Sequence, residues 1–176
     1  RYPRDLKRDI DLAEKEKVDY LFVSSVQEMY RDNFLTYVDV EKLSARLCGK
    51  DRPDHFKGVT TIVAKLFNII NPDKAFFGEK DAQQFVVIKR MVKDLNFDIE
   101  ITGVSTVREK DGLAMSSRNV YLNPQERKAA LVLFRSLELA REKIEKGERN
   151  SGVIKNEMEE LIINEKLVNL IYVSIC

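Results

Sequence analysis

The chain has 176 residues, of which 44% are hydrophobic, and its formal net charge is +1 at pH 7. This length and apolar content predict a soluble globular protein with one ordinary domain, or with one domain and a small addition. Because the charges balance, we expect neither nucleic acid nor a membrane as a partner. No apolar run approaches the length of a membrane span.

Cys48 and Cys176 are the only cysteines. They are too few and too far apart for a disulfide framework or a zinc site, so we predict a reducing, cytoplasmic location and no metal ligands among the site residues. The chain starts at Arg1, and residues 171–176 look like a strand that stops at the chain end. Our interpretation is an internal piece of a longer protein.

The first forty residues alternate between charged and apolar patterns. Pro3 is a helix-start residue, and the apolar spacing after it predicts an amphipathic helix that ends near Lys17. The β-branched and aromatic residues at 18–23 predict a strand, residues 28–33 a polar loop, and residues 34–40 a more exposed strand.

The central part has the pattern of alternating helices and strands. A helix is predicted to end before Asn71, where an Asn-Pro pair stops it. A strand at 74–77, a helix at 80–95 and a strand at 99–104 follow. This order predicts parallel βαβ units, so the fold class is α/β.

The pattern changes after the last of these strands. Asn123 opens a helix with Glu126 at the capping-box position, and this helix is predicted to end at Gly147. A second helix begins at Ser151, and a final strand begins at Leu167. Two helices and a strand predict a small α+β second domain.

One candidate site is the stretch from Gly78 to Gln84, where a strand runs through glycine into a helix. Glycine lets the backbone approach a ligand, and helix N-terminal amides favour an anion. Lys80 can neutralise a phosphate, whereas the acceptor-only Asp81 suits ribose hydroxyls. Gln84 lies one turn from Lys80 and can face the same ligand. The alternative is a solvated helix start with an incidental ion pair.

A second candidate site lies at residues 112–119. Gly112 offers flexibility, Ser116 and Ser117 offer hydroxyl donors, and Arg118 offers a fork for phosphate oxygens. Together the two stretches predict a nucleotide site. The alternative for the second is an ordinary interdomain turn.

His55 is the only histidine, and it lies just ahead of a predicted helix. Without a nucleophile or a metal partner in view, a structural role is one interpretation. The other is that Arg52 and His55 reach a carboxylate or phosphate, with Lys57 joining them.

Three motifs, in this order and spacing, closely resemble the pantothenate synthetases, and the similarity extends over essentially the whole chain. They are Arg52-Pro53-Asp54-His55-Phe56, Phe77-Gly78-Glu79-Lys80-Asp81-Ala82-Gln83-Gln84, and the stretch from Gly112 to Asn119. The resemblance implies a Rossmann-like domain of the nucleotidyltransferase superfamily. It also implies ATP and Mg²⁺, the substrates pantoate and β-alanine, a pantoyl-adenylate intermediate and a homodimer.

The resemblance also implies roles for individual residues. Lys80 and Arg118 are expected to be catalytic, Gln84 to bind pantoate, and Arg52 and His55 to support the substrate site. Val107 is expected to contact adenine through its backbone. The residues expected to bind ATP are Gly78, Glu79, Lys80, Asp81, Val107, Met115, Ser116, Ser117 and Arg118.

The chain departs from the family pattern in two respects. The histidine-containing signature and the early asparagine and glutamine that contact pantoate are expected before Arg1, and glycine or another small residue is expected where Asp54 stands. We assign residues 1–108 to an N-terminally incomplete nucleotide- and pantoate-binding domain and residues 109–176 to the small second domain. We expect this chain alone to have little or no ligase activity.

Two other functions remain open from the sequence. One is another adenylyl- or cytidylyltransferase with a different acceptor, which would not require Gln84 or the loop around His55. The other is a non-catalytic dimerisation module that retains the fold.

Overall fold

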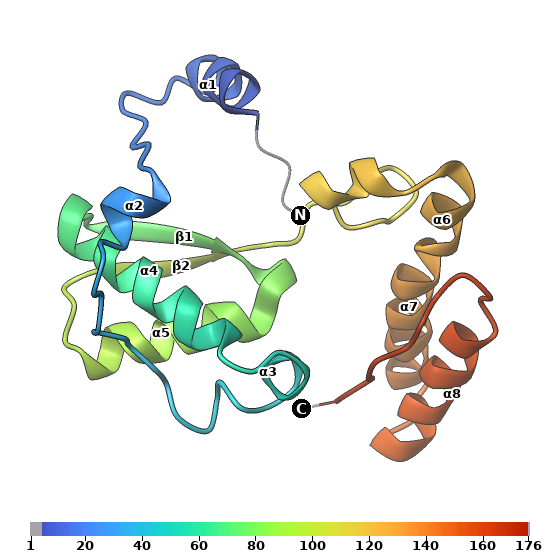
Figure 1. The fold of residues 1–176 in the computed structure, drawn as a ribbon. Coiled ribbons are helices and arrows are strands. Elements are labelled where there is room, and N and C mark those ends of the chain that lie inside the picture. The colour runs from blue at the N-terminus through green and yellow to red at the C-terminus, as the bar shows by residue number, and fades with distance from the viewer. Residues whose placement is uncertain (1–4, 176) are drawn as a thin grey trace. The chain divides into compact units, whose positions relative to one another are not determined.

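The computed structural model describes residues 5–175, so the helix-start position expected at Pro3 lies outside the described residues. The chain divides into two compact units, residues 1–104 and residues 105–176. Each unit has its own helices (Figure 1). The domain boundary predicted from the sequence stays a prediction.

The first unit contains a parallel pair of strands, β1 (Lys74–Gly78) and β2 (Glu100–Val104), with Phe76 opposite Thr102. Helix α5 (Ala82–Asp94) connects them. The predicted strands, helix and parallel βαβ unit are therefore confirmed, and the fold is α/β. This arrangement brings the carboxyl ends of both strands to the same edge.

The core of this unit lies on one face of the sheet. Helix α4 (His55–Ile70) contributes Phe56, Ala64 and Phe67, and α5 contributes Val87, Ile88, Met91 and Val92. The strand residues Ala75, Phe77 and Ile101 pack against these helices, whereas Phe76 on the other face is 65% exposed. The end of α4 before Asn71 is confirmed, and Asn71 takes the left-handed conformation that stops a helix.

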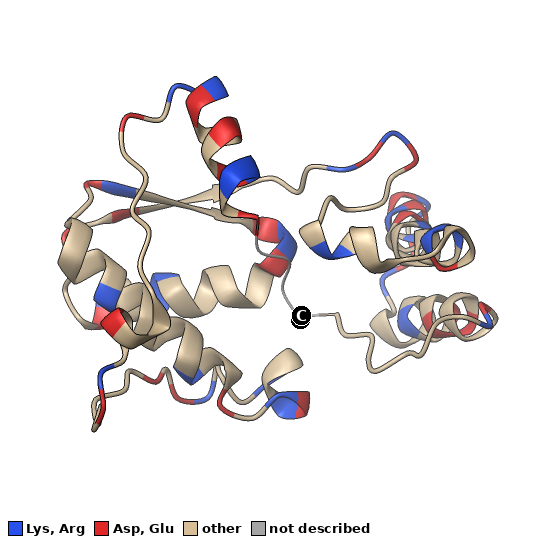
Figure 2. Cartoon of the chain, turned by 45° about the horizontal axis from the view of Figure 1, so that its top comes forward, with Lys and Arg blue, Asp and Glu red and all other residues tan. Residues whose placement is uncertain are grey.

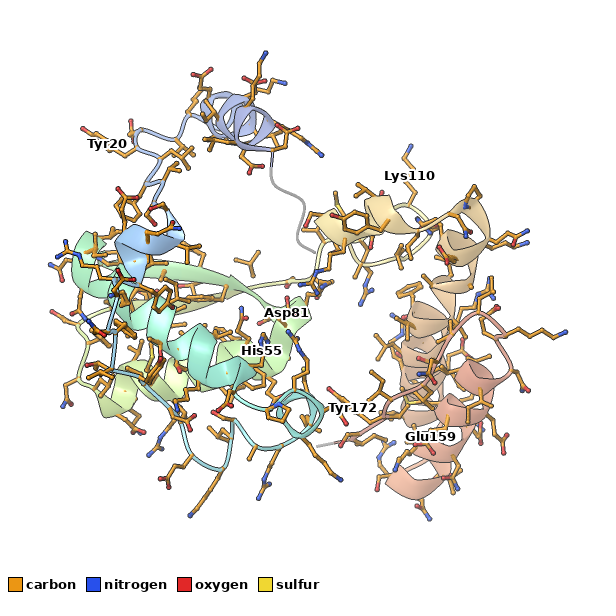
Figure 3. All side chains as sticks on the ribbon, viewed as in Figure 1. Tyr20, His55, Asp81, Lys110, Glu159 and Tyr172 are labelled. Carbon is orange, nitrogen blue, oxygen red and sulfur yellow. The ribbon has the colours of Figure 1, made fainter. Side chains whose placement is uncertain are left out.

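The helix predicted to end near Lys17 is present as α1 (Leu6–Lys15), with Asp5 as its N-cap. The strand predicted at 18–23 does not form. A strand exists through backbone pairing, and these residues pair with neither described strand. Tyr20 in the middle of this segment is 93% exposed and points away from the ribbon (Figure 3).

The loop predicted at 28–33 begins with a single helical turn, α2 (Val26–Met29), because Ser25 and Glu28 form a capping box. The strand predicted at 34–40 is also absent. Its backbone bonds to α4 instead: the Val38 amide donates to Thr61 Oγ1 (3.0 Å), and Thr60 Oγ1 donates to the Val38 carbonyl (2.6 Å). Threonine hydroxyls occupy the groups that a neighbouring strand would need.

The second unit has three α-helices in its described part: α6 (Pro124–Ala129), α7 (Leu131–Glu145) and α8 (Ser151–Ile163). The first predicted helix is confirmed but interrupted at Ala130, and its capping box is present, with Asn123 Oδ1 accepting from the Glu126 amide at 2.9 Å. The second predicted helix is α8. These helices bury Val132, Ser136, Ile154, Met158 and Ile162.

The strand predicted from Leu167 is not formed over residues 167–175, and Cys176 lies outside the described residues. As described, this unit is helical, with one antiparallel bridge between Arg108 and Ala114. The predicted strand was therefore wrong over residues 167–175, and the α+β class of the second domain stays a prediction. Figure 2 shows Lys and Arg interspersed with Asp and Glu along α1, α7 and α8. No helix in the described range 5–175 is long and apolar enough to cross a membrane.

Candidate nucleotide site

The stretch from Gly78 to Gln84 begins where β1 ends. A 3-10 turn, Glu79–Asp81, follows Gly78, and α5 begins at Ala82, so the helix starts two residues later than predicted. Asp81 lies in this turn (Figure 3). Such a turn leaves backbone amides of the helix start without intrahelical partners, which suits an anion.

Gly78 has an ordinary extended conformation, with φ −69° and ψ 127°. A Cβ built on it would meet no described atom within 4 Å. Neither conformation nor packing within the described residues therefore requires glycine here. The missing side chain leaves the backbone at Gly78 open to the approach of a ligand.

Lys80 and Asp81 form a weak ion pair, with 3.9 Å between Nζ and Oδ2. Their side chains are 41% and 65% exposed. Exposed pairs of this kind add little stability. The ammonium and the carboxylate are accordingly both accessible to a ligand.

Gly103 on β2 makes room for the carboxylate of Glu79. A Cβ at Gly103 would lie 2.6 Å from Glu79 Oε1 and 3.2 Å from the Phe85 ring. Sequence reasoning missed this residue. The available signal was a glycine inside a predicted strand, which marks a close approach.

Gln83 is a second residue that sequence reasoning missed. Its amide nitrogen donates to the carbonyls of Leu43 (2.9 Å) and Arg46 (2.6 Å), and its oxygen accepts from the Cys48 amide (3.1 Å). The next residue, Gln84, is half-buried. Its spacing of one helical turn from Lys80 singled out Gln84, whereas no local signal marked Gln83.

Arg52 and His55 are brought together, with 3.2 Å between Arg52 Nη2 and His55 Nδ1. Arg52 Nη1 also lies 3.8 Å from the sulfur of Cys48. Lys57 lies instead over the ring of Tyr37, 4.9 Å from its centroid. The structure thus groups two of these three residues.

The second stretch starts in a β-hairpin. The Met115 amide donates to the Val107 carbonyl (2.9 Å), and the Glu109 amide donates to the Leu113 carbonyl (2.8 Å). The Val107 and Met115 side chains stay largely exposed. The hairpin therefore presents both residues beside each other at its open end.

Gly112 lies in the hairpin turn with φ +97°, in the left-handed region. A Cβ on it would lie 2.1 Å from Cδ1 of Phe134. Arg108 covers the same ring, 4.9 Å from its centroid, and donates to the Gly112 carbonyl at 3.0 Å. The fold therefore requires glycine at this position, and the flexibility expected of it stays a prediction.

The hairpin is also tied to α6 by an ion pair between Asp111 and Arg127, with 2.9 Å between oxygen and nitrogen. The hydrogen bond from Arg127 lowers the pKa of the Asp111 carboxyl below its usual value. The same bond raises the pKa of Arg127. Sequence reasoning missed both residues, because sixteen residues separate them.

Residues Ser117–Tyr121 form a short 3-10 helix that follows the hairpin. Ser116 is its N-cap and accepts from the Arg118 amide at 3.3 Å. Asn119 anchors the turn, since its side-chain amide donates to the Ala114 carbonyl at 3.1 Å. Ser117 and Arg118 are exposed, so their hydroxyl and guanidinium are accessible to an anion.

The model of the pantoate–β-alanine ligase family matches residues 1–176. The chain is 60% identical to the pantothenate synthetase of Caldicellulosiruptor bescii over 174 residues, 99% of this chain and 62% of that protein. It is 55% identical to the one from Thermosipho africanus, again over 99% of this chain and 62% of that protein. The chain thus spans about three fifths of the length of these relatives.

Comparison with solved structures finds the same family. The pantothenate synthetase of Thermus thermophilus matches with a TM-score of 0.91 and 50% identity, over 94% of this chain and 60% of that one. A pantoate–β-alanine ligase from Francisella tularensis, solved in complex with beta-gamma ATP and β-alanine, matches with a TM-score of 0.75 and 32% identity, over 91% of this chain and 59% of that one.

Proposed function

Because the chain belongs to the pantoate–β-alanine ligase family, we propose that it provides ATP- and pantoate-binding residues of an enzyme that joins pantoate to β-alanine. The observation that supports this best is the match over the whole chain, together with an accessible Lys80 and Asp81 after β1. The complex of the Francisella relative with beta-gamma ATP and β-alanine supports the same substrates.

The proposed reaction has two steps. The pantoate carboxylate attacks the α-phosphorus of ATP, pyrophosphate leaves, and a pantoyl-adenylate forms. The amine of β-alanine then attacks the acyl carbon, AMP leaves, and the amine loses a proton. Positioning and charge neutralisation lower both barriers, with little covalent participation by the protein.

The residues divide these tasks by their chemistry. Lys80 and Arg118 neutralise charge that develops on phosphate oxygens. Asp81 accepts hydrogen bonds from the ribose, Gln84 hydrogen-bonds pantoate, and the Val107 backbone contacts adenine. Glu79, Met115, Ser116 and Ser117 complete the nucleotide contacts beside Gly78, and Arg52 with His55 supports the substrate site.

Mg²⁺ fits this set of residues as a partner of the nucleotide. The described residues contain no group of three His, Cys, Asp or Glu that would hold a metal. Mg²⁺ often binds mainly through substrate phosphates and water, so the absence of such a group among the described residues is compatible with an ion that arrives with ATP. When bound, the ion would neutralise phosphate charge and favour pyrophosphate release.

We also propose that the enzyme is a cytoplasmic homodimer. The cysteine content supports a reducing location, and the resemblance supports the dimer. Sedimentation measurements would test the association state, and a monomer at micromolar concentration would contradict the dimer for this chain.

Titration of ATP into the chain tests the nucleotide site. We expect Lys80→Met to weaken ATP binding roughly tenfold or more, because a charge-assisted contact to phosphate is lost. Lys93→Met is the matched control, since Lys93 is an exposed lysine in the last turn of α5, the helix that follows Lys80. Equal ATP affinity in the Lys80 variant and its parent would contradict the assignment.

Pantothenate formation from ATP, pantoate and β-alanine tests the activity. We expect this chain alone to turn over little or no substrate, since the relatives named above are longer. A rate close to that of a full-length relative would overturn this expectation. Stimulation of pyrophosphate exchange by another acid, and not by pantoate, would favour a different acceptor.

A further inference from the structure

The side chain of Gln83 joins two segments that are 35 to 40 residues apart in the chain. Gln83 lies in the first turn of α5, beside the proposed pantoate residue Gln84. Its amide uses the nitrogen twice as a donor and the oxygen once as an acceptor, all toward backbone groups of the loop at residues 43–48.

Two of these bonds surround a residue with unfavourable backbone geometry. Leu47 has φ +48° and ψ −124°, a conformation that glycine adopts readily and leucine does not. Gln83 binds the carbonyl of Arg46 and the amide of Cys48, the peptide neighbours on either side of Leu47. Such strain persists where surrounding contacts compensate for it.

The held loop leads directly into the group at Arg52 and His55. Helix α3 (Cys48–Asp51) starts at the residue whose amide Gln83 binds, and the Arg52 amide donates to the Cys48 carbonyl at 3.0 Å. Arg52 Nη1 lies near the Cys48 sulfur, and Arg52 Nη2 lies near His55 Nδ1. A continuous set of contacts therefore runs from Gln83 to His55.

We propose that Gln83 is a positioning residue that sets the Arg52–His55 group relative to Lys80, Asp81 and Gln84. This inference rests on the proposed function, because the position of the Arg52–His55 group matters for activity only if these residues lie at the substrate site. Both donor hydrogens of the Gln83 amide and one acceptor site of its oxygen are occupied by the loop, so its role is to act through its neighbours.

The thiol of Cys48 allows a direct test. In a Cys176→Ser chain, Cys48 is the only cysteine, and its alkylation rate by iodoacetamide reports the accessibility of the loop. We expect Gln83→Met, which keeps length but not hydrogen bonds, to raise this rate by about tenfold. Gln83→Glu places a carboxylate against two carbonyls and is expected to have at least the same effect. Gln27→Glu, an exposed site on α2, is the control.

Rates within twofold of the parent in both Gln83 variants, with circular dichroism unchanged, would overturn the proposal. If Gln83→Met does not fold, adding Leu47→Gly is expected to restore folding, because glycine accepts the Leu47 conformation. Failure of that double variant to fold would assign Gln83 to general stability and also overturn the proposal.

Protection of Cys48 by ATP is the measurement that a purely structural role of Gln83 would not change. We expect ATP to slow Cys48 alkylation in the parent, and Gln83→Met to abolish this protection while its ATP affinity stays within threefold. Equal protection in both chains would overturn the coupling. If the parent binds no ATP, the proposed function fails, and the ligand-free rates still decide whether Gln83 holds the loop.

Discussion

The two candidate stretches have similar compositions but use glycine in opposite ways. Gly78 has an ordinary conformation, and a side chain there would meet open space among the described residues. Gly112 has a left-handed φ and packs against the Phe134 ring. The described structure of the first unit does not require glycine at position 78, whereas the second unit requires glycine at position 112.

The supports of the two stretches differ as well. The stretch after β1 is tied to distant backbone through Gln83. The hairpin and 3-10 helix of the second unit are held mainly by short-range bonds, with the pair of Asp111 and Arg127 as a longer connection. A glycine close to a cationic side chain in the sequence can therefore have different roles. The contacts around the glycine decide which role it has.

Gly112→Ala should give the largest effect. The new Cβ would clash with Phe134 and would also force alanine into a left-handed conformation, so we expect a loss of about 3 kcal/mol or more in the unfolding free energy. Urea denaturation, followed by helical circular dichroism, measures this.

Gly147→Ala is the matched control, because Gly147 has φ +96° but open space around its Cβ position. It should lose only about 1 kcal/mol, the cost of the backbone conformation alone. Adding Phe134→Leu should recover part of the loss in Gly112→Ala. Equal losses at Gly112 and Gly147 would show that the Phe134 contact is unimportant.

Gly78→Ala should leave stability unchanged or slightly raised, because alanine fits the conformation and restricts the unfolded chain. Under the proposed function it should weaken ATP binding by about tenfold, since a methyl group would block the approach to the backbone. Calorimetric titration with ATP, beside a thermal unfolding curve, separates the two effects. Unchanged ATP affinity would remove the ligand explanation for this glycine.

The elements with strong local signals were predictable. Residues 55–70 and α5 have regular apolar spacing, β1 and β2 are short segments on either side of α5, and Asn123 with Glu126 encodes a capping box. Local sequence signals could not decide whether residues 18–23 and 34–40 form strands. A strand depends on a partner backbone, and for Val38 that partner proved to be threonine side chains of α4.

The candidate site shows the same division. Lys80, Asp81 and Arg118 were identifiable because their chemistry is visible in the sequence and they are exposed. Gln83, Gly103 and the partner of Asp111 act through contacts across the fold, which no local spacing encodes. The residues proposed to bind the nucleotide were thus easier to single out than the residues that contact them across the fold.

Asp54 provides the smallest and most discriminating effect. It precedes α4 with φ +61° and ψ −2°, and its side chain makes no capping hydrogen bond. The glycine expected there by family resemblance would suit this left-handed conformation, which aspartate tolerates better than most residues. The geometry of the loop is therefore that of a glycine position, although aspartate occupies it.

We expect Asp54→Gly to be as stable as the parent or up to about 1 kcal/mol more stable, and Asp54→Ala to be about 1 kcal/mol less stable. Asp54→Asn isolates the charge, which favours the α4 N-terminus by a few tenths of a kcal/mol. Thermal unfolding of the three variants at one pH gives the comparison. If alanine and glycine prove equally stable at position 54, the left-handed conformation has no cost there.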